Sequence, residues 1–264
     1  MSGIRRSLSG LFDVLVIHIV MATIFIVAWE LAIRYRVLNP FYFGQPSQVF
    51  QYFIVKLQDG TLLTATRVTV VESLTGFALG MSIGTATGLG LWWSHTLTAL
   101  VRPLLVALNA VPKLIFAPIF ILAVGLGFEF KVAISFAGVV IVALLSAYIG
   151  SKQADVDHVD MIRSLGGTRW QVFHMIIVPT ALPWVVVSME INIGLALIGA
   201  VVGEFLASDA GLGYLAVYGA GTFDMSLVLV AVSTLMALAI VMYGAVRAFE
   251  AWVLPVRPEP VRAT

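Results

Sequence analysis

The chain has 264 residues, of which 60% are hydrophobic and only 11% are charged, and its formal net charge is +1. Soluble domains carry about 25% charged residues, so this composition excludes a water-soluble fold and indicates an integral membrane protein. The small net charge gives no sign of nucleic acid as a partner, and the absence of cysteine excludes disulfides, thiol nucleophiles and cysteine metal sites.

Six apolar runs are long enough to cross a membrane as helices. About 20 helical residues cross a hydrocarbon layer of about 30 Å. On this measure we predict transmembrane spans at residues 11–33, 66–93, 97–124, 130–150, 180–206 and 226–249. The runs are too long for the strands of a barrel, so the predicted fold is all-α with six transmembrane helices.

The first apolar run follows Arg5 and Arg6 and ends near Glu30 and Arg34. A cleaved secretory signal has an apolar region of only about 7–15 residues, followed by small residues. This run is longer, so we predict that residues 1–40 form a cytoplasmic tip and a retained first transmembrane helix.

Lysine and arginine residues near the span ends predict the orientation, because cytoplasmic loops carry an excess of them. With the N-terminus inside, the cytoplasmic side holds nine, which are Arg5, Arg6, Arg102, Lys152, Arg163, Arg169, Arg247, Arg257 and Arg262. The outer side then holds five, which are Arg34, Arg36, Lys56, Arg67 and Lys131. We therefore predict that both termini are cytoplasmic and that residues 251–264 form a disordered tail.

Two connections on the outer side have recognisable patterns. Residues 47–58 place apolar side chains near one face behind Ser47, a helix-capping residue, and predict an amphipathic helix in the outer interface. Residues 207–224 are rich in glycine and predict a loop that covers the outer mouth of the protein.

The second span carries four glycines at intervals of four residues, Gly76, Gly80, Gly84 and Gly88. Residues four apart lie on one face of a helix, and glycine lets a neighbouring backbone approach closely. We predict that this face packs tightly against another helix.

The third span contains Pro103, Pro112 and Pro118, with Asn109 and Lys113 among them. Proline removes backbone hydrogen bonds, and broken helices at membrane depth are tolerated where they are buried in protein or line a cavity. This stretch is therefore a candidate wall of a translocation pathway. The alternative is a structural kink from which Lys113 reaches water.

Two acidic residues, Glu190 and Glu204, lie inside apolar spans, where an ionisable side chain is costly. Each is either a pathway or gating residue or a partner in a structural hydrogen bond, and the sequence leaves both interpretations open. We keep both as pathway candidates beside Asn109, Pro112 and Lys113.

Motifs for chemistry within the chain are missing or out of place. There is no G-x-x-x-x-G-K-[ST] loop for a nucleotide phosphate, no H-E-x-x-H, and no metal-ligand spacing among the four histidines. We predict no catalytic residue, cofactor site or metal site. The stretch from Gly80 to Gly84 matches G-x-S-x-G, but a nucleophile elbow needs a strand-turn-helix context. An intramembrane serine protease using Ser82 with His18 is the enzyme alternative.

The segment from residue 151 to residue 183 is polar although apolar spans flank it. Its first part repeats apolar residues at helical spacing: Val156, Val159, Ile162 and Leu165. Gly166 and Gly167 then turn the chain, and Thr168 caps a second helix that enters the membrane past Pro179 and Pro183. The sequence predicts a rigid helix-turn-helix in the cytoplasm, which suits a lever that docks on another protein.

This segment resembles the EAA motif of bacterial ABC importer permeases, which is written E-A-A-x-x-x-G, nine residues, I-x-L-P. Here it reads Asp160-Met161-Ile162, then Gly166, nine residues, and Ile176-x-Val178-Pro179. Four more stretches are similar to those typical of the nitrate/sulfonate/taurine branch of the family: residues 46–50, 73–91, 111–127 and 196–215.

The resemblance implies a permease core of five helices in residues 41–250, preceded by one extra helix, in the lipid of the bacterial inner membrane. It implies a second permease copy as a homodimer, two ATPase subunits that bind ATP and Mg²⁺, and a periplasmic or lipid-anchored substrate-binding protein. It also implies that the coupling segment, residues 151–178 between spans four and five, docks on the ATPase. The residues assigned to docking are Asp160, Met161, Ile162, Leu165, Gly166, Gly167 and Arg169.

The chain departs from the motif where Met161 and Ile162 replace two alanines and where the shorter Asp160 replaces glutamate. Individual docking contacts are therefore expected to differ from those of the family. The branch implies a small solute, such as a sulfonate, taurine, nitrate or a pyrimidine-type vitamin precursor. A stand-alone secondary transporter is the alternative, but it predicts internal repeats and has no use for a projecting cytoplasmic segment.

Overall fold

The structure, a computed structural model, describes the backbone of residues 2–254 and the side chains of residues 16–18 and 20–254. Every element in this part of the chain is a helix, which confirms the predicted all-α fold. The described residues divide into two compact units, residues 2–63 with 215–233 and residues 64–214 with 234–254. Residues 255–264 of the predicted disordered tail lie outside the described part.

Within the described residues, five helical runs are long and apolar enough to cross a membrane: Val16–Arg34, Thr61–Trp93, Phe128–Ser151, Arg169–Ala207 and Met225–Val253. The predicted third span passes this test only as a pair, His95–Ala110 with Lys113–Val124, and the two helices meet at 98°. The predicted third span is therefore bent, and the count of six spans holds if this pair crosses as one. The bend falls at Pro112, whereas Pro103 is accommodated inside the first helix.

The first unit contains α1 (Ser2–Arg34), α2 (Pro40–Phe43) and α3 (Pro46–Gln58). The prediction that Ser47 caps a helix is wrong, because α3 begins one residue earlier and Gln45 is its N-cap residue. Ser47 instead donates its backbone N–H and its hydroxyl to the Glu30 carboxylate, each at 3.1 Å. A carboxylate is stabilised at the N-terminus of a helix, so Glu30 fastens α1 to the start of α3.

The glycine-rich stretch at 207–224, predicted as a loop, contains the helix α11 (Leu212–Gly221). Its first N–H groups find acceptors on Glu204, nine positions before Gly213, and on Thr69, 143 positions before Leu212, and a local sequence pattern does not reveal the second. A turn with Phe223 at φ 58° then leads into α12 (Met225–Val253), and the Phe223 ring stacks on Phe41 at 5.8 Å.

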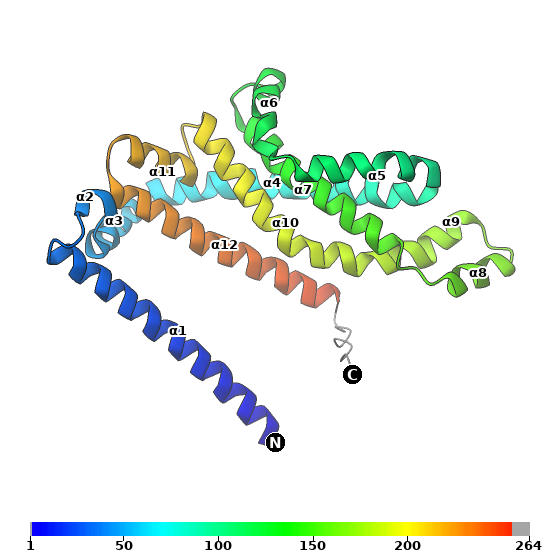
Figure 1. Ribbon diagram of the computed structural model, residues 1–264, viewed down its shortest axis with the longest axis horizontal. Coiled ribbons are helices and arrows are strands. Elements are labelled where there is room, and N and C mark those ends of the chain that lie inside the picture. Colours follow the sequence, from blue (N-terminus) through cyan, green and yellow to red (C-terminus); the bar gives the residue numbers. More distant parts are fainter. Residues whose placement is uncertain (1, 255–264) are drawn as a thin grey trace. The chain divides into compact units, whose positions relative to one another are not determined.

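The second unit is built around α7 (Phe128–Ser151), which packs against both α4 (Thr61–Gly90) and α10 (Val178–Ala207) (Figure 1). The other elements of this region are η1 (Leu91–Trp93), α5 (His95–Ala110), η2 (Lys113–Phe116), α6 (Ala117–Val124), α8 (Val156–Ser164), α9 (Arg169–Val172) and η3 (Phe173–Ile177). The core of the unit includes side chains of α7 that are at most 2% exposed: Phe130, Ile134, Val139, Ala143 and Ala147.

Glycines let the three central helices approach closely. The α4 glycine face meets α7: a methyl group on Gly84 would lie 2.5 Å from the Val140 carbonyl oxygen, and one on Gly88 would meet the Leu144 carbonyl. Gly80 and Gly76, one and two turns before Gly84, meet the side chains of Val139 and Ser135 on α7 in the same way. Backbones this close leave no space for a side chain and gain dispersion contacts along the whole interface.

The predicted second helix of the coupling segment is continuous with the fifth span. Helix α9, the π-helical turn η3 and α10 form one run from residue 169 to residue 207. Pro179 lies in the first turn of α10 and Pro183 farther inside it, so both prolines lie within this continuous helical run. The wide turn η3 ends two residues before Pro179, and such turns re-satisfy backbone groups that a proline leaves unpaired.

Candidate functional site

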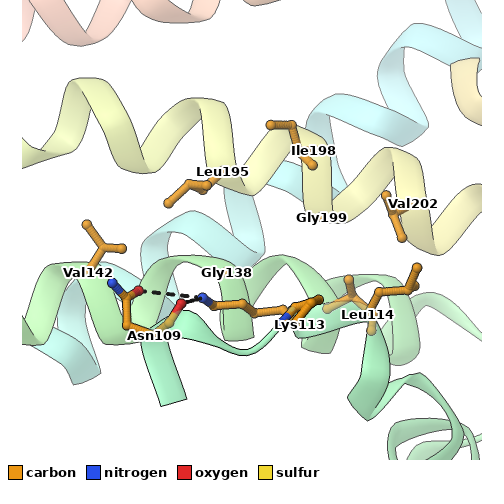
Figure 2. Close-up of a pocket in the computed structure, with 11 residues that line it drawn as sticks. Asn109, Lys113, Leu114, Gly138, Val142, Leu195, Ile198, Gly199 and Val202 are labelled. Carbon is orange, nitrogen blue, oxygen red and sulfur yellow. Dashed lines mark hydrogen bonds between the residues drawn. The ribbon is translucent and has the colours of Figure 1, made fainter. Parts of the chain in front are cut away.

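A pocket of about 360 Å³ lies beside the bend between α5 and η2 (Figure 2). Asn109, Pro112 and Lys113 line one side of it. The remaining lining comes from η2, α7 and α10 and is apolar: Leu114, Ile134, Gly138, Val142, Leu195, Ile198, Gly199 and Val202. An apolar pocket with a few polar groups at one edge is the usual form of a small-molecule site.

The polar edge of the pocket is set by the end of α5. The Lys113 ammonium donates to the Asn109 backbone carbonyl at 2.6 Å and lies 3.5 Å from its side-chain oxygen (Figure 2). The last carbonyls of a helix lack intrahelical donors, and a nearby lysine satisfies them. The bend thereby holds one ammonium group and one amide group beside an otherwise apolar space.

Two of the five predicted pathway residues do not line this pocket. Glu190 on α10 accepts a hydrogen bond from the Tyr243 hydroxyl on α12 at 2.9 Å. Glu204 lies farther along α10 and is 1% exposed. The structure therefore brings together Asn109, Pro112 and Lys113 and gives the two glutamates other partners.

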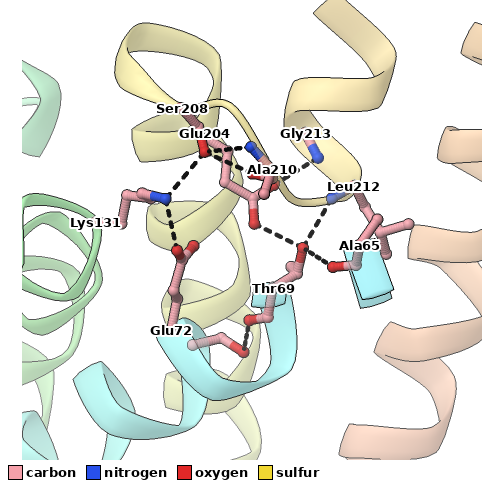
Figure 3. Close-up of polar contacts among 10 residues, drawn as sticks. Ala65, Thr69, Glu72, Lys131, Glu204, Ser208, Ala210, Leu212 and Gly213 are labelled. Atoms are coloured by element: carbon pink, nitrogen blue, oxygen red, sulfur yellow. Dashed lines mark hydrogen bonds and ion pairs between the residues drawn. The ribbon is translucent and has the colours of Figure 1, made fainter. Parts of the chain in front are cut away.

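Glu204 holds the first turn of α11 (Figure 3). One carboxylate oxygen accepts the Gly213 N–H at 2.5 Å, and the other lies 2.6 Å from the Thr69 hydroxyl. Thr69 in turn accepts the Leu212 N–H at 2.9 Å. Gly211 has φ +110° in this turn, and a methyl group there would run into the Glu204 carboxylate. The arrangement matches the structural interpretation of Glu204, that of a helix cap.

Lys131, which the orientation count places at an outer span end, lies near the start of α7 in the same polar cluster and is buried. Its ammonium lies 2.8 Å from a Glu72 oxygen and donates to the Ser208 hydroxyl at 2.9 Å (Figure 3). Glu72 and Lys131 are opposite charges near the starts of two predicted spans, and this was the available sequence signal for their pairing. Thr69 and Ser208 carried no such signal and were missed.

The coupling segment projects an unpartnered helix. No residue of α8 is buried. Two of its apolar side chains are strongly exposed, Val156 at 66% and Met161 at 52%, and so is Leu165, which follows the helix, at 82%. The helix ends where the Gly167 N–H donates to the Ile162 carbonyl at 2.9 Å, with Gly166 at φ +81°. Only glycine adopts that backbone conformation without strain.

The second helix of the segment starts as predicted. Thr168 caps α9 by accepting the Gln171 N–H, and the Gln171 side chain accepts the Thr168 N–H in return. Asp160, the acidic residue of the motif, is exposed and lies 3.5 Å from Arg163. Arg169, another predicted docking residue, instead donates to the Trp93 carbonyl at 3.0 Å.

Two features bear on the enzyme alternative. Ser82 lies in the middle of α4, so its G-x-S-x-G match is not a strand-to-helix nucleophile elbow. Within the part of the chain that the structure describes, no group of three or more His, Cys, Asp or Glu side chains is placed to hold a metal ion.

Residues 83–255 match the family described as the binding-protein-dependent transport system inner membrane component. The chain belongs to this family. The permease is 30% identical to the formylaminopyrimidine transport permease protein ThiX of Halalkalibacterium halodurans over 231 residues, 88% of this chain and 92% of that protein. It is 30% identical to the riboflavin transport system permease protein RibX of Chloroflexus aurantiacus, over 83% of this chain and 81% of that one.

A third relative, the taurine transport system permease protein TauC of Escherichia coli, is 24% identical over 77% of this chain and 75% of its own. Among solved structures, the permease has the fold of a chain of the inward-facing MetNI methionine ABC transporter, with a TM-score of 0.60 at 16% identity. That match covers 79% of this chain and 98% of the other. The predicted family is therefore confirmed: the protein is a multi-pass ABC importer permease subunit, and the ATPase of such importers is a separate partner.

Proposed function

We propose that this permease moves a small organic solute into the cell by alternating access, driven by a separate ATPase that docks on the coupling segment. The projection of α8 carries the proposal. It is a short helix with no buried residue, capped by Asp155 at its start and ended by the turn at Gly166. Val156, Met161 and Leu165 are exposed along it and at its end. Exposed apolar side chains on an ordered helix indicate an interface with another protein.

The pocket beside the α5–η2 bend supports a solute with an apolar body and one polar or anionic group. Its walls from α7 and α10 offer apolar side chains and backbone, while Lys113 and Asn109 supply donors at one edge. An inorganic anion such as nitrate would lose its hydration against these walls without replacement, and a flat ring would not. Two relatives are named for transport of formylaminopyrimidine and riboflavin and one for taurine. We therefore favour a pyrimidine-type compound over nitrate, taurine and other sulfonates.

The assembly that we propose contains two copies of this chain, two ATPase subunits and a substrate-binding protein on the outer side. A single copy leaves α5 with little cover: Leu100, Leu104 and Val106 on that helix are each about 60% exposed or more. The second copy is the proposed partner in the membrane. Both termini are proposed to be cytoplasmic, as the distribution of lysine and arginine predicts.

The test is affinity purification of the tagged permease from its native membranes in mild detergent. We expect a P-loop ATPase to co-purify with the unchanged chain in about equal amount. Gly166→Val should reduce its recovery, because valine at φ +81° costs about 1–2 kcal/mol and redirects α8. Gly60→Val is the matched control: Gly60 has φ +78° and, like Gly166, open space around it, but it lies before α4.

Equal recovery of the ATPase with both valine variants would contradict docking through α8. Recovery of no ATPase at all, under conditions that preserve another ABC importer, would contradict the proposed assembly. The substrate is tested separately by uptake of a radiolabelled aminopyrimidine and of radiolabelled taurine into cells that lack or carry the gene. Uptake of taurine alone would overturn the preference for a ring compound.

A further inference from the structure

Five side chains connect the coupling segment to the corner between α4 and α5. Trp92 and Trp93 come from η1 at that corner, and Arg169, Trp170 and Phe173 come from α9 and the first residue of η3. We call these five residues the corner cluster. All five belong to one compact unit. The two tryptophans of η1 lie more than 70 residues before the other three in the sequence.

Arg169 is the centre of the corner cluster. Its guanidinium lies 5.6 Å from the centre of the Trp92 ring and 5.4 Å from that of the Trp93 ring, and it donates to the Trp93 carbonyl at 3.0 Å. Trp93 ends η1, where backbone carbonyls lack helical donors. One side chain therefore satisfies a helix end and contacts two aromatic faces, which a planar guanidinium does better than an ammonium.

The aromatic rings of the corner cluster also contact one another across this joint, although Trp93 and Trp170 remain partly exposed. Trp93 and Trp170 are stacked with centres 6.0 Å apart, and Phe173 lies 5.4 Å from Trp93 and 5.5 Å from Trp92. Every one of these pairs joins η1 to the α9–η3 run. The joint is thus made of several contacts that act together, which gives it a defined geometry.

The joint stands next to a point where the helix is irregular. Phe173 begins the π-helical turn η3, which separates α9 from the long membrane helix α10. Turns of this kind occur frequently at functional positions of helices. A rotation of α8 and α9 would be absorbed at η3 on the α10 side and would reach α4 and α5 through the corner cluster.

Tryptophan also gathers at membrane interfaces, and this is the competing explanation for Trp92, Trp93 and Trp170. Anchoring in lipid headgroups requires only that each ring be exposed near the interface. It does not require an arginine that is bonded to the carbonyl of a distant segment and placed over two of the rings.

We infer that the corner cluster is the joint through which movement of α8 reaches α4 and α5, with Arg169 as a positioning residue and not as a contact with the ATPase. The inference rests on the proposed function, in which α8 receives that movement from the ATPase. On this inference, movement of α9 shifts α5, and the shift of α5 moves the Lys113 edge of the pocket.

The experiment measures ATP hydrolysed per solute imported in the reconstituted complete importer, together with recovery of the ATPase. Arg169→Ala is expected to leave recovery unchanged and to raise that ratio by about fivefold or more, because coupling between sites typically corresponds to factors of about 5 to 150. Arg169→Lys should show an intermediate rise, since it keeps the charge but loses the planar contact. Trp93→Ala should raise the ratio of ATP hydrolysed to solute imported as much as Arg169→Ala does. The double variant Arg169→Ala with Trp93→Ala should raise it no further, because the effects of contacts in one joint are not additive.

Arg34→Ala is the control. Arg34 is exposed and bonds to Glu30 at 2.9 Å within α1, outside the coupling segment, so the variant also removes one positive charge and one side-chain contact, but within a single helix. We expect its ratio to stay at the original value. An unchanged ratio in Arg169→Ala, or an equal rise in Arg34→Ala, would overturn the inference that the corner cluster is a joint. Loss of ATPase recovery in Arg169→Ala would place Arg169 in the docking surface instead, and absence of any ATPase would overturn the proposed function itself.

Discussion

The Lys131 ammonium lies 2.8 Å from the Glu72 carboxylate in the interior of the permease, and the two side chains are 7% and 2% exposed. The pair joins α7 to α4, and Ser208 at the end of α10 accepts a further hydrogen bond from Lys131. Three membrane helices thus meet at one ion pair. Removal of either partner would leave the other as an uncompensated buried charge.

We expect Glu72→Ala to lower the free energy of unfolding by about 3–5 kcal/mol, as loss of one partner of a buried pair does. The double variant Glu72→Leu with Lys131→Met should recover most of that loss, because it removes both charges and keeps the volume. Both variants are compared by the midpoint of thermal unfolding in detergent, with size-exclusion chromatography as the readout of the folded fraction.

An exposed ion pair provides the comparison for this prediction. Lys56 and Asp59 lie 3.3 Å apart with 30% and 38% of their side chains exposed, so Lys56→Ala should change the midpoint little. If Glu72→Ala unfolds at the same temperature as Lys56→Ala, the buried pair does not hold the three helices together.

The glycine face of α4 predicts a difference between neighbouring glycines. Gly84→Ala places a methyl group 2.5 Å from the Val140 carbonyl oxygen, which forces α4 and α7 apart. We expect a loss of about 1–3 kcal/mol, typical of overpacking. Gly90→Ala, at the last residue of α4 and with open space around it, should be neutral or slightly stabilising. Equal unfolding midpoints for the two variants would show that the α4–α7 contact is looser than described.

Charge reversal in the coupling segment tests its docking surface. Asp160→Lys should lower the amount of ATPase recovered with the permease by about tenfold or more, because unfavourable charges at an interface cost several kcal/mol. Asp209→Lys is the control, since Asp209 is also exposed but follows α10 at its other end. Equal recovery with both variants would remove Asp160 from the interface.

The pocket edge predicts an effect on transport without an effect on assembly. Lys113→Met keeps the length of the side chain and removes the ammonium that lies 2.6 Å from the Asn109 carbonyl. We expect solute uptake to fall about tenfold, the equivalent of one hydrogen bond to a charged group, while ATPase recovery stays the same. Unchanged uptake would favour the alternative that Lys113 only completes a structural kink.

The sequence by itself determined the membrane location, the all-α fold and the projecting segment, because each is written in local chemistry. Apolar runs of about 20 residues define spans wherever they occur. Spacing of four places Gly76, Gly80, Gly84 and Gly88 on one face, and Gly166 and Thr168 specify a turn and a cap within a few residues. These signals need no knowledge of the rest of the chain.

Only the tertiary structure decided which polar groups meet. Thr69 joins Glu204 in capping α11, and Lys131 pairs with Glu72, because the bundle brings together residues more than 50 positions apart. Arg169, an exposed residue that the motif assigns to ATPase docking, also lies over Trp92 and Trp93, more than 70 positions earlier in the chain. In an apolar interior a charged side chain takes the partner within reach, and the packing of helices, not the order of residues, sets that reach.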